Sequence, residues 1–315
     1  MKRISRLSPI LSLAPFIRGG ALVAFNVGSE GTIYLVVALQ PLDYRESELI
    51  ASFPKTISAQ PQTYRVVGLA GKEIVLDVII EREPFNIYDV QPLRDELLLV
   101  CVRSQYRGPG DFDRNGRVYK RDGTFAREIL LGDGIQSVQT TSAGVVWTSY
   151  FDEGVFGNFG WQRPVGECGL VAWSSGGEKL YEFEAGETLD AICDCYALNV
   201  ETDNDVWLYY YTEFPLVHLR DRKIVESWLM PVSGSNAFAI SGNHALFRGG
   251  YKDRDTLHLF RLGNDGDVTP VADIELQTEK GDALSASHVV GRADSIHFIS
   301  GDSLYRVDVG TAATS

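Results

Sequence analysis

Polar and aromatic side chains that could hold a ligand gather in two segments between apolar runs. The first, SQYRGPGDFDRN (residues 104–115), follows Arg103, and the second, FDEGVFGNFGWQRPVGECG (residues 151–169), follows Tyr150. Aromatic faces offer apolar contact and charged tips orient a polar molecule, which suits a small polar molecule, a glycan or a peptide. We therefore predict a ligand-binding site formed by Arg103, Tyr106, Arg107, Tyr150, Asp152, Glu153, Asn158 and Trp161.

Each of these residue types has a definite chemical use in such a site. Arg103 and Arg107 would clamp an anionic group through paired hydrogen bonds, and aromatic rings would stack on the ligand. The alternative is that the aromatic residues pack the two segments onto the fold. We favour packing for Phe151 and Phe156, and for Trp161 both roles stay open.

The segment DFDRNGRVYKRD (residues 111–122) resembles a calcium-binding loop. It has the D-x-D-x-N-G order, with Asp122 at the position where such loops carry a bidentate Glu. Calcium needs several oxygen ligands at short range, and alternating acids on a turn can supply them. The possible cofactor is therefore a divalent cation, calcium, at Asp111, Asp113 and Asn115. The alternative is that NGRVY is a turn that leads into a strand.

Composition excludes several classes of protein. The chain has 315 residues, with 29 Lys+Arg against 42 Asp+Glu and a net charge of -13. Binding to nucleic acid needs clustered basic residues, and the sequence has no such cluster. No apolar run is long enough to span a membrane, so we expect neither a nucleic-acid nor a membrane partner. The apolar N-terminal run is interrupted by Arg6, Pro9 and Pro15, which argues against a secretion signal. Four scattered cysteines favour a reducing, cytoplasmic location over a secreted one.

The elements that must position these residues are short β-strands. Runs such as TIYLVVAL, ELLLVCV and SIHFIS are rich in branched and aromatic residues and are separated by Gly, Asp and Asn. WLYYYTEF (residues 207–214) has aromatics on both faces and is expected to be buried. Polar turns recur roughly 44 to 54 residues apart, a period typical of propeller blades. Their centres are Gly71, Asp122, Gly176, Asp221 and Asp265.

The repeat predicts an all-β, six-bladed β-propeller in a single domain, residues 1–315. The blades start near Gly19, Asn86, Gln136, Thr188, Asn236 and Leu284. The last repeat stops after its third strand, and KRISRLSPI (residues 2–10) has the place and length to supply the missing outer strand. The loops between second and third strands are long in blades 1 to 3, where the first runs from Gln40 to Gln62, and short in the other three. Loops this long in a compact domain are usually functional or disordered. The alternative is that they are neutral surface insertions, which the entropy of loop closure tolerates.

In blade number and strand pattern the whole chain resembles six-bladed propellers of the NHL and gluconolactonase-like type. The resemblance implies a central channel lined by the first strand of each blade. Polar residues at these strands are Gln136, Asp190, Asp194, Asn236 and His288, with Asp89 and Gln139 among others. Gln136, Asp190, Asp194, Asn236 and His288 are therefore further candidate ligand-binding residues. They could hold a metal ion at the channel mouth, or they could only satisfy buried water.

Two functions follow. The first is a ligand-binding or interaction scaffold whose partner, a small polar molecule, glycan, peptide or protein, binds on the face with the long loops. The alternative is a metal-dependent hydrolase of the lactonase type. The sequence has no G-x-S-x-G elbow, H-E-x-x-H motif or phosphate-binding loop, so no catalytic residue is predicted.

Overall fold

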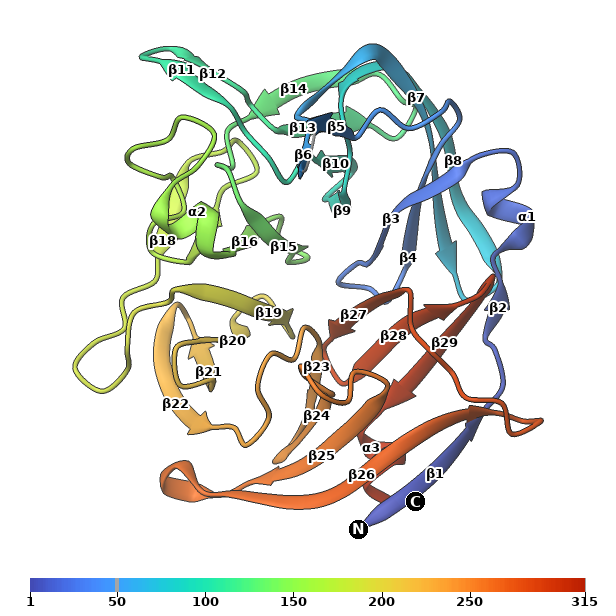
Figure 1. Cartoon of the computed structure of the whole chain (residues 1–315), viewed down its shortest axis with the longest axis vertical. Coiled ribbons are helices and arrows are strands. Elements are labelled where there is room, and N and C mark those ends of the chain that lie inside the picture. The colour runs from blue at the N-terminus through green and yellow to red at the C-terminus, as the bar shows by residue number, and fades with distance from the viewer. Residues whose placement is uncertain (49–50, 315) are drawn as a thin grey trace. The chain divides into compact units, whose positions relative to one another are not determined.

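The computed structural model of the chain describes residues 1–48 and 51–314. The chain divides into two compact units: Met1–Pro15 with Asp194–Ser315, called the terminal unit, and Phe16–Cys193, called the middle unit. Both consist of the short strands that the branched and aromatic runs predict (Figure 1). Among the described residues no helix is both long enough and apolar enough to cross a membrane.

The middle unit contains three four-stranded antiparallel sheets, blades 1 to 3, with orders β3-β4-β7-β8, β9-β10-β13-β14 and β15-β16-β17-β18. Their strands are β3 (Ala21–Val27), β4 (Ile33–Ala38), β7 (Ile57–Ala70), β8 (Glu73–Phe85), β9 (Asp89–Leu93), β10 (Glu96–Val100), β13 (Gly116–Lys120), β14 (Phe125–Ile129), β15 (Ile135–Thr140), β16 (Val146–Tyr150), β17 (Leu170–Trp173) and β18 (Lys179–Glu182). The long loops hold two small hairpins and a short helix: β5 (Arg45–Glu48) with β6 (Ala51–Pro54), β11 (Tyr106–Gly108) with β12 (Asp111–Phe112), and α2 (Asp152–Phe156).

The terminal unit contains blades 4 to 6, with orders β19-β20-β21-β22, β23-β24-β25-β26-β1 and β27-β28-β29-β2. Their strands are β19 (Asp194–Val200), β20 (Asp205–Tyr211), β21 (Pro215–Arg220), β22 (Lys223–Leu229), β23 (Phe238–Ser241), β24 (His244–Arg248), β25 (Thr256–Leu262), β26 (Val268–Thr278), β1 (Lys2–Leu7), β27 (His288–Arg292), β28 (Ser295–Ser300), β29 (Ser303–Asp308) and β2 (Leu11–Ser12). The remaining elements are α1 (Ala14–Ile17), α3 (Val309–Thr314) and the 3₁₀ turn η1 (Asn264–Gly266).

The six sheets are the blades of a six-bladed β-propeller, as the repeat predicts. Each predicted turn centre lies between the third and fourth strand of its blade. Asp221 and Asp265 adopt positive φ angles of 51° and 56°, a conformation that aspartate tolerates better than most residues. The long loops also lie where the sequence places them, although residues 49 and 50 of the predicted Gln40–Gln62 loop are outside the described residues. The single domain over residues 1–315 stays a prediction.

An N-terminal strand completes the last blade, but its residues differ from the predicted KRISRLSPI. Leu11 pairs with Leu304 and Ser12 with Ser303, so the short strand β2 is the outer strand of blade 6. Lys2–Leu7 instead pairs in parallel with β26 and forms a fifth strand of blade 5. In Figure 1 the chain runs along β26 as β1 and then continues to β29. The physical reason is that β26 has eleven residues and leaves a long outer edge for pairing.

Apolar residues from neighbouring blades pack together within each unit. Val36 and Tyr64 of blade 1 belong to one buried cluster with Leu97 and Leu99 of blade 2. Blades 2 and 3, 4 and 5, and 5 and 6 share similar clusters. Side chains alternate between the two faces of a strand, so each blade can place apolar residues against its neighbour within the unit.

Candidate functional site

Arg103, the first residue of the predicted ligand site, forms ion pairs with other residues of the chain. Its side chain is 3% exposed and lies in the middle unit. Nη2 lies 2.9 Å from Oδ2 of Asp133 and Nη1 lies 2.5 Å from Oε2 of Glu153, while the guanidinium stands 4.1 Å from the centre of the Phe159 ring. Burial raises the pKa of Asp133 to about 6, although the charge of Arg103 opposes this. The guanidinium therefore joins the loops of blades 2 and 3.

Trp161 makes a second connection between these loops. Its indole Nε1 donates a 2.7 Å hydrogen bond to the carbonyl oxygen of Ser104. Its ring lies 4.8 Å from the Tyr106 ring and 5.9 Å from the Phe112 ring, measured between centroids. Tyr106 also donates its backbone N–H to the carbonyl oxygen of Phe159. These contacts are the packing role that the sequence left open for Trp161.

The other predicted residues of this face divide into one buried residue and three exposed ones. Tyr150 is fully buried, and its hydroxyl donates to the carbonyl oxygen of Leu131. Arg107, Asp152 and Asn158 lie at the surface. Phe156, for which packing was favoured, is 68% exposed, so that prediction is wrong. The structure thus brings the two loops together over a packed interior, with Phe156 and three polar residues exposed.

The oxygen atoms of the predicted calcium loop have partners within the chain. Asp113 accepts hydrogen bonds from the backbone N–H of Gln105 at 3.0 Å and from Arg107 at 2.8 Å, and Arg107 also pairs with Asp111. Asn115 is fully buried and its amide donates to two backbone carbonyl oxygens, those of Cys101 and Gly132. Within the described ranges, no three His, Cys, Asp or Glu residues form a group that could hold a metal ion.

The polar residues at the first strands belong to different units. Gln136 and Asp190 are exposed residues of the middle unit. Asp194, Asn236 and His288 are in the terminal unit, where Asn236 accepts a 3.2 Å hydrogen bond from Arg248 and burial lowers the pKa of His288. The structure does not bring the five together in one unit, and their role as metal ligands stays a prediction.

Two asparagines that the sequence analysis missed join the first strands of neighbouring blades. In the middle unit, Asn26 donates to the Asp89 carboxylate at 2.6 Å and to the Val138 carbonyl oxygen at 3.0 Å. In the terminal unit, Asn199 donates to the carbonyl oxygens of Phe238 and Ala293 and accepts the Ala293 N–H at 2.7 Å. A signal was present in the sequence, because AFNV (residues 24–27) and ALNV (residues 197–200) are copies of one pattern.

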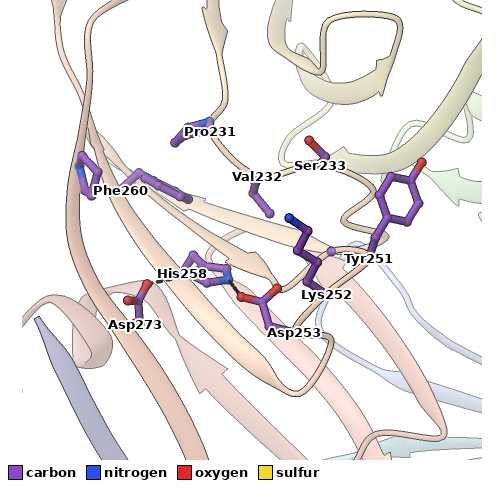
Figure 2. Close-up of a pocket in the computed structure, with 11 residues that line it drawn as sticks. Pro231, Val232, Ser233, Tyr251, Lys252, Asp253, His258, Phe260 and Asp273 are labelled. Atoms are coloured by element: carbon purple, nitrogen blue, oxygen red, sulfur yellow. Dashed lines mark hydrogen bonds and ion pairs between the residues drawn. The ribbon is translucent and has the colours of Figure 1, made fainter.

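A cavity of about 410 Å³ lies in the terminal unit, outside every predicted site. Figure 2 shows its walls: the connection Pro231–Ser233, the loop Gly250–Asp253, and side chains of β25 and β26. His258 lies between two carboxylates, with Nε2 2.9 Å from Asp253 and Nδ1 2.8 Å from Asp273. The imidazole therefore holds the loop against β26, and Lys252 extends from that loop into the cavity (Figure 2).

Four aromatic residues beside this cavity form a continuous cluster, which we call the aromatic shelf: Tyr196, Tyr211, Phe214 and Tyr251. The Tyr251 ring lies 6.0 Å from that of Tyr196 and 6.3 Å from that of Phe214, and the hydroxyls of Tyr196 and Tyr251 are hydrogen-bonded. Tyr251 is nevertheless 56% exposed and Tyr211 is 45% exposed. The expectation that residues 207–214 are buried is therefore wrong at the end of β20.

Gly234 allows the Tyr251 ring to lie close to the backbone. It has a φ angle of +77°, and a Cβ atom at this position would lie 2.4 Å from the Tyr251 ring. Only glycine allows both this backbone conformation and so close an approach. Tyr251 is thus an exposed ring that the surrounding structure holds in place. The sequence gives little signal for this, because the contacting residues come from three separate segments.

Comparisons with known proteins find one family model and several solved structures similar to this chain. Residues 169–307 match a family model described as the YxzG family. Among solved structures, a chain of "Crystal Structure of Mitotic Checkpoint Complex" is similar over 98% of this chain and 95% of that one, with a TM-score of 0.50 and 8% identity. The Neurospora crassa Pan2 WD40 domain is similar over 96% and 79%, with a TM-score of 0.48 and 12% identity. The WD40 β-propeller domain of Doa1 is similar over 91% and 92%, with a TM-score of 0.44 and 9% identity.

No curated protein matches the chain. The first structural likeness shows the fold alone, and together with the six sheets it defines the class of protein: a β-propeller. The matches to WD40 propellers carry no residue of a site across, because the identities are low.

Proposed function

We propose that this propeller is a protein-interaction scaffold, and that it binds a peptide segment of a partner at the aromatic shelf and the adjoining cavity. The observation that carries the proposal is Tyr251, a 56% exposed ring that contacts Tyr196 and Phe214 at the edge of a cavity of about 410 Å³. Tyrosine is enriched among residues that dominate binding energy, because a large ring is buried with little loss of side-chain freedom.

The surroundings of Tyr251 favour a peptide over a smaller ligand. The apolar surface continues beyond the cavity to Tyr211, and Leu229, which pairs with Pro215 beside Phe214, is 63% exposed. Lys252, Asp253 and Asp273 place charges of both signs at the cavity, where they could pair with a peptide backbone or with polar side chains. Interfaces commonly have this arrangement of an apolar centre with a polar rim.

The proposal can be tested by selecting binders from a displayed library of random peptides with the full chain. Affinities of the selected peptides are then measured by fluorescence anisotropy. Tyr251→Ala should weaken binding by about thirtyfold, the effect of losing a typical hot-spot residue. Phe156→Ala removes a ring of the middle unit that is 68% exposed, against 56% for Tyr251. It is the matched control and should leave the affinity unchanged. Peptides that bind Tyr251→Ala as well as the parent would refute the proposal.

The predicted face on the long loops of blades 1 to 3 is a second candidate location for the same function. Its exposed residues are Arg107, Asp152 and Asn158. Selected peptides that lose affinity in Arg107→Ala and not in Tyr251→Ala would favour this face. A relation to NHL or gluconolactonase-like propellers, a glycan or other small polar ligand, and a cytoplasmic location stay predictions.

A further inference from the structure

A second surface of the terminal unit has different chemistry. A groove of about 510 Å³ lies between β1 and the segment formed by β29 and α3. Arg3 to Leu7 and Ile274 line one side, and Arg306, Val307, Asp308, Thr311 and Ala312 line the other. The groove shares no lining residue with the cavity beside the aromatic shelf.

The strand along this groove has a free edge. β1 is the outermost strand of its five-stranded sheet, in parallel register with Lys2 opposite Asp273. Asp273 donates its N–H to the carbonyl oxygen of Met1 at 2.9 Å. Because backbone groups alternate in direction along a strand, those of Arg3 face β26 and those of Lys2, Ile4 and Arg6 face away from it. The outward groups can accept another strand.

The groove is basic, although the whole chain is acidic. Its lining contains three arginines and one aspartate, while the net charge of the chain is -13. Arg306 is paired with Asp308. Nη1 of Arg3 donates to the carbonyl oxygen of Ala312 at 3.1 Å, whereas its buried Nε has no hydrogen-bond partner among the described residues. An incoming carboxylate can pair with the guanidinium group of Arg3, which lines the groove.

We propose that an acidic, extended segment of a partner protein adds to β1 as a further strand. Its backbone pairs with the outward groups of Lys2, Ile4 and Arg6, and its acidic side chains alternate over the groove beside Arg3. This mode of recognition takes affinity from main-chain hydrogen bonds and specificity from alternate side chains. A second copy of the chain is a poorer occupant, because pairing two β1 strands would place arginine beside arginine.

The probe is a fluorescein-labelled nine-residue peptide of alternating Glu and Val, titrated into the full chain at low salt. The matched probe has Lys in place of Glu. We expect saturable binding of the acidic peptide that weakens as salt is added, and no binding of the basic one.

Ile4→Pro tests the backbone pairing. Proline removes an N–H that points away from β26 and fits an extended edge strand, so the fold should persist with unchanged thermal unfolding. Binding of the acidic peptide should weaken about tenfold. Arg6→Glu should weaken it about fivefold, whereas Arg261→Glu, an exposed arginine of the same sheet, should not.

Two results would overturn the proposal. One is acidic-peptide binding that neither Ile4→Pro nor Arg6→Glu reduces. The other is dimerisation in analytical ultracentrifugation that Ile4→Pro abolishes, since the occupant would then be a second copy. Tyr251→Ala should leave acidic-peptide binding intact, so this inference and the proposed function can fail separately.

Discussion

Replacing Asn199 with alanine should destabilise the terminal unit strongly. Asn199 is fully buried on β19 and joins the chain near β23 and β27 through three hydrogen bonds. Alanine would leave the Ala293 N–H without its partner and would remove one hydrogen bond from each carbonyl oxygen of Phe238 and Ala293. An orphaned buried N–H costs about 1–3 kcal/mol and each lost hydrogen bond about 1 kcal/mol.

The expected loss in free energy of unfolding is therefore about 3 kcal/mol. The Ala293 carbonyl oxygen also accepts a hydrogen bond from the N–H of Ile240. It would keep this partner in the variant, so we take the lower end of the summed cost. The assay is urea unfolding followed by tryptophan fluorescence, with hydrogen exchange of the Ala293 amide as a local readout. Exchange at this amide should accelerate more than at amides in the middle of β24.

The matched control is Asn204→Ala, in the exposed turn before β20. No side-chain hydrogen bond of Asn204 is present among the described residues, so its replacement should cost less than about 0.5 kcal/mol. If Asn199→Ala lost no more stability than this control, or if the Ala293 amide stayed equally protected, the asparagine would not join these strands. The argument for its counterpart Asn26 would then fail as well.

Three further outcomes follow. Arg103→Ala should lower the free energy of unfolding in urea by about 3–5 kcal/mol, because it removes the ion-pair partner of the buried Asp133. If this variant were as stable as Arg107→Ala, which changes an exposed arginine, the prediction would be wrong. Burial lowers the pKa of His297 from 6.5 to about 4. Between pH 7.5 and pH 5.5 the imidazole therefore becomes protonated in the unfolded chain but stays neutral in the native state. The free energy of unfolding should decrease by about 1 kcal/mol when the pH is lowered over this range. His297→Gln should remove this part of the pH dependence of the free energy of unfolding. If that free energy changed with pH equally in the parent and the variant, the prediction would be wrong.

The strands and turns could be predicted because their signals are local. Each apolar run needs only its own alternation to form a strand. Gly71, Asp221 and Asp265 at the turn centres need only their own tolerance for positive φ. The sixfold repeat then follows from spacing, and the missing outer strand of blade 6 predicts closure by the N-terminus. The lengths of the loops between second and third strands could be read in the same way.

Pairing between distant residues could not be predicted, because it depends on which groups the fold brings into contact. Arg103 and Trp161 are residue types that often bind ligands, but both have partners within the chain. Arg103 pairs with Glu153, and Trp161 donates to the Ser104 carbonyl oxygen. The N-terminal residues Lys2–Leu7 and Leu11–Ser12 can both form strands, and only the available edges of β26 and β29 decide where each one pairs. The aromatic shelf likewise exists only where three segments meet.

The sequence alone determined the fold class, the number of blades and the positions of the long loops, because hydrophobic alternation and turn chemistry act over a few residues. Only the tertiary structure decided which polar and aromatic side chains have partners within the chain and which are exposed. Hydrogen bonds and ring contacts can join residues 50 or more positions apart, and such contacts leave no local pattern in the sequence. For this reason the two binding surfaces that we propose, at Tyr251 and at the edge of β1, contain none of the site residues predicted from the sequence.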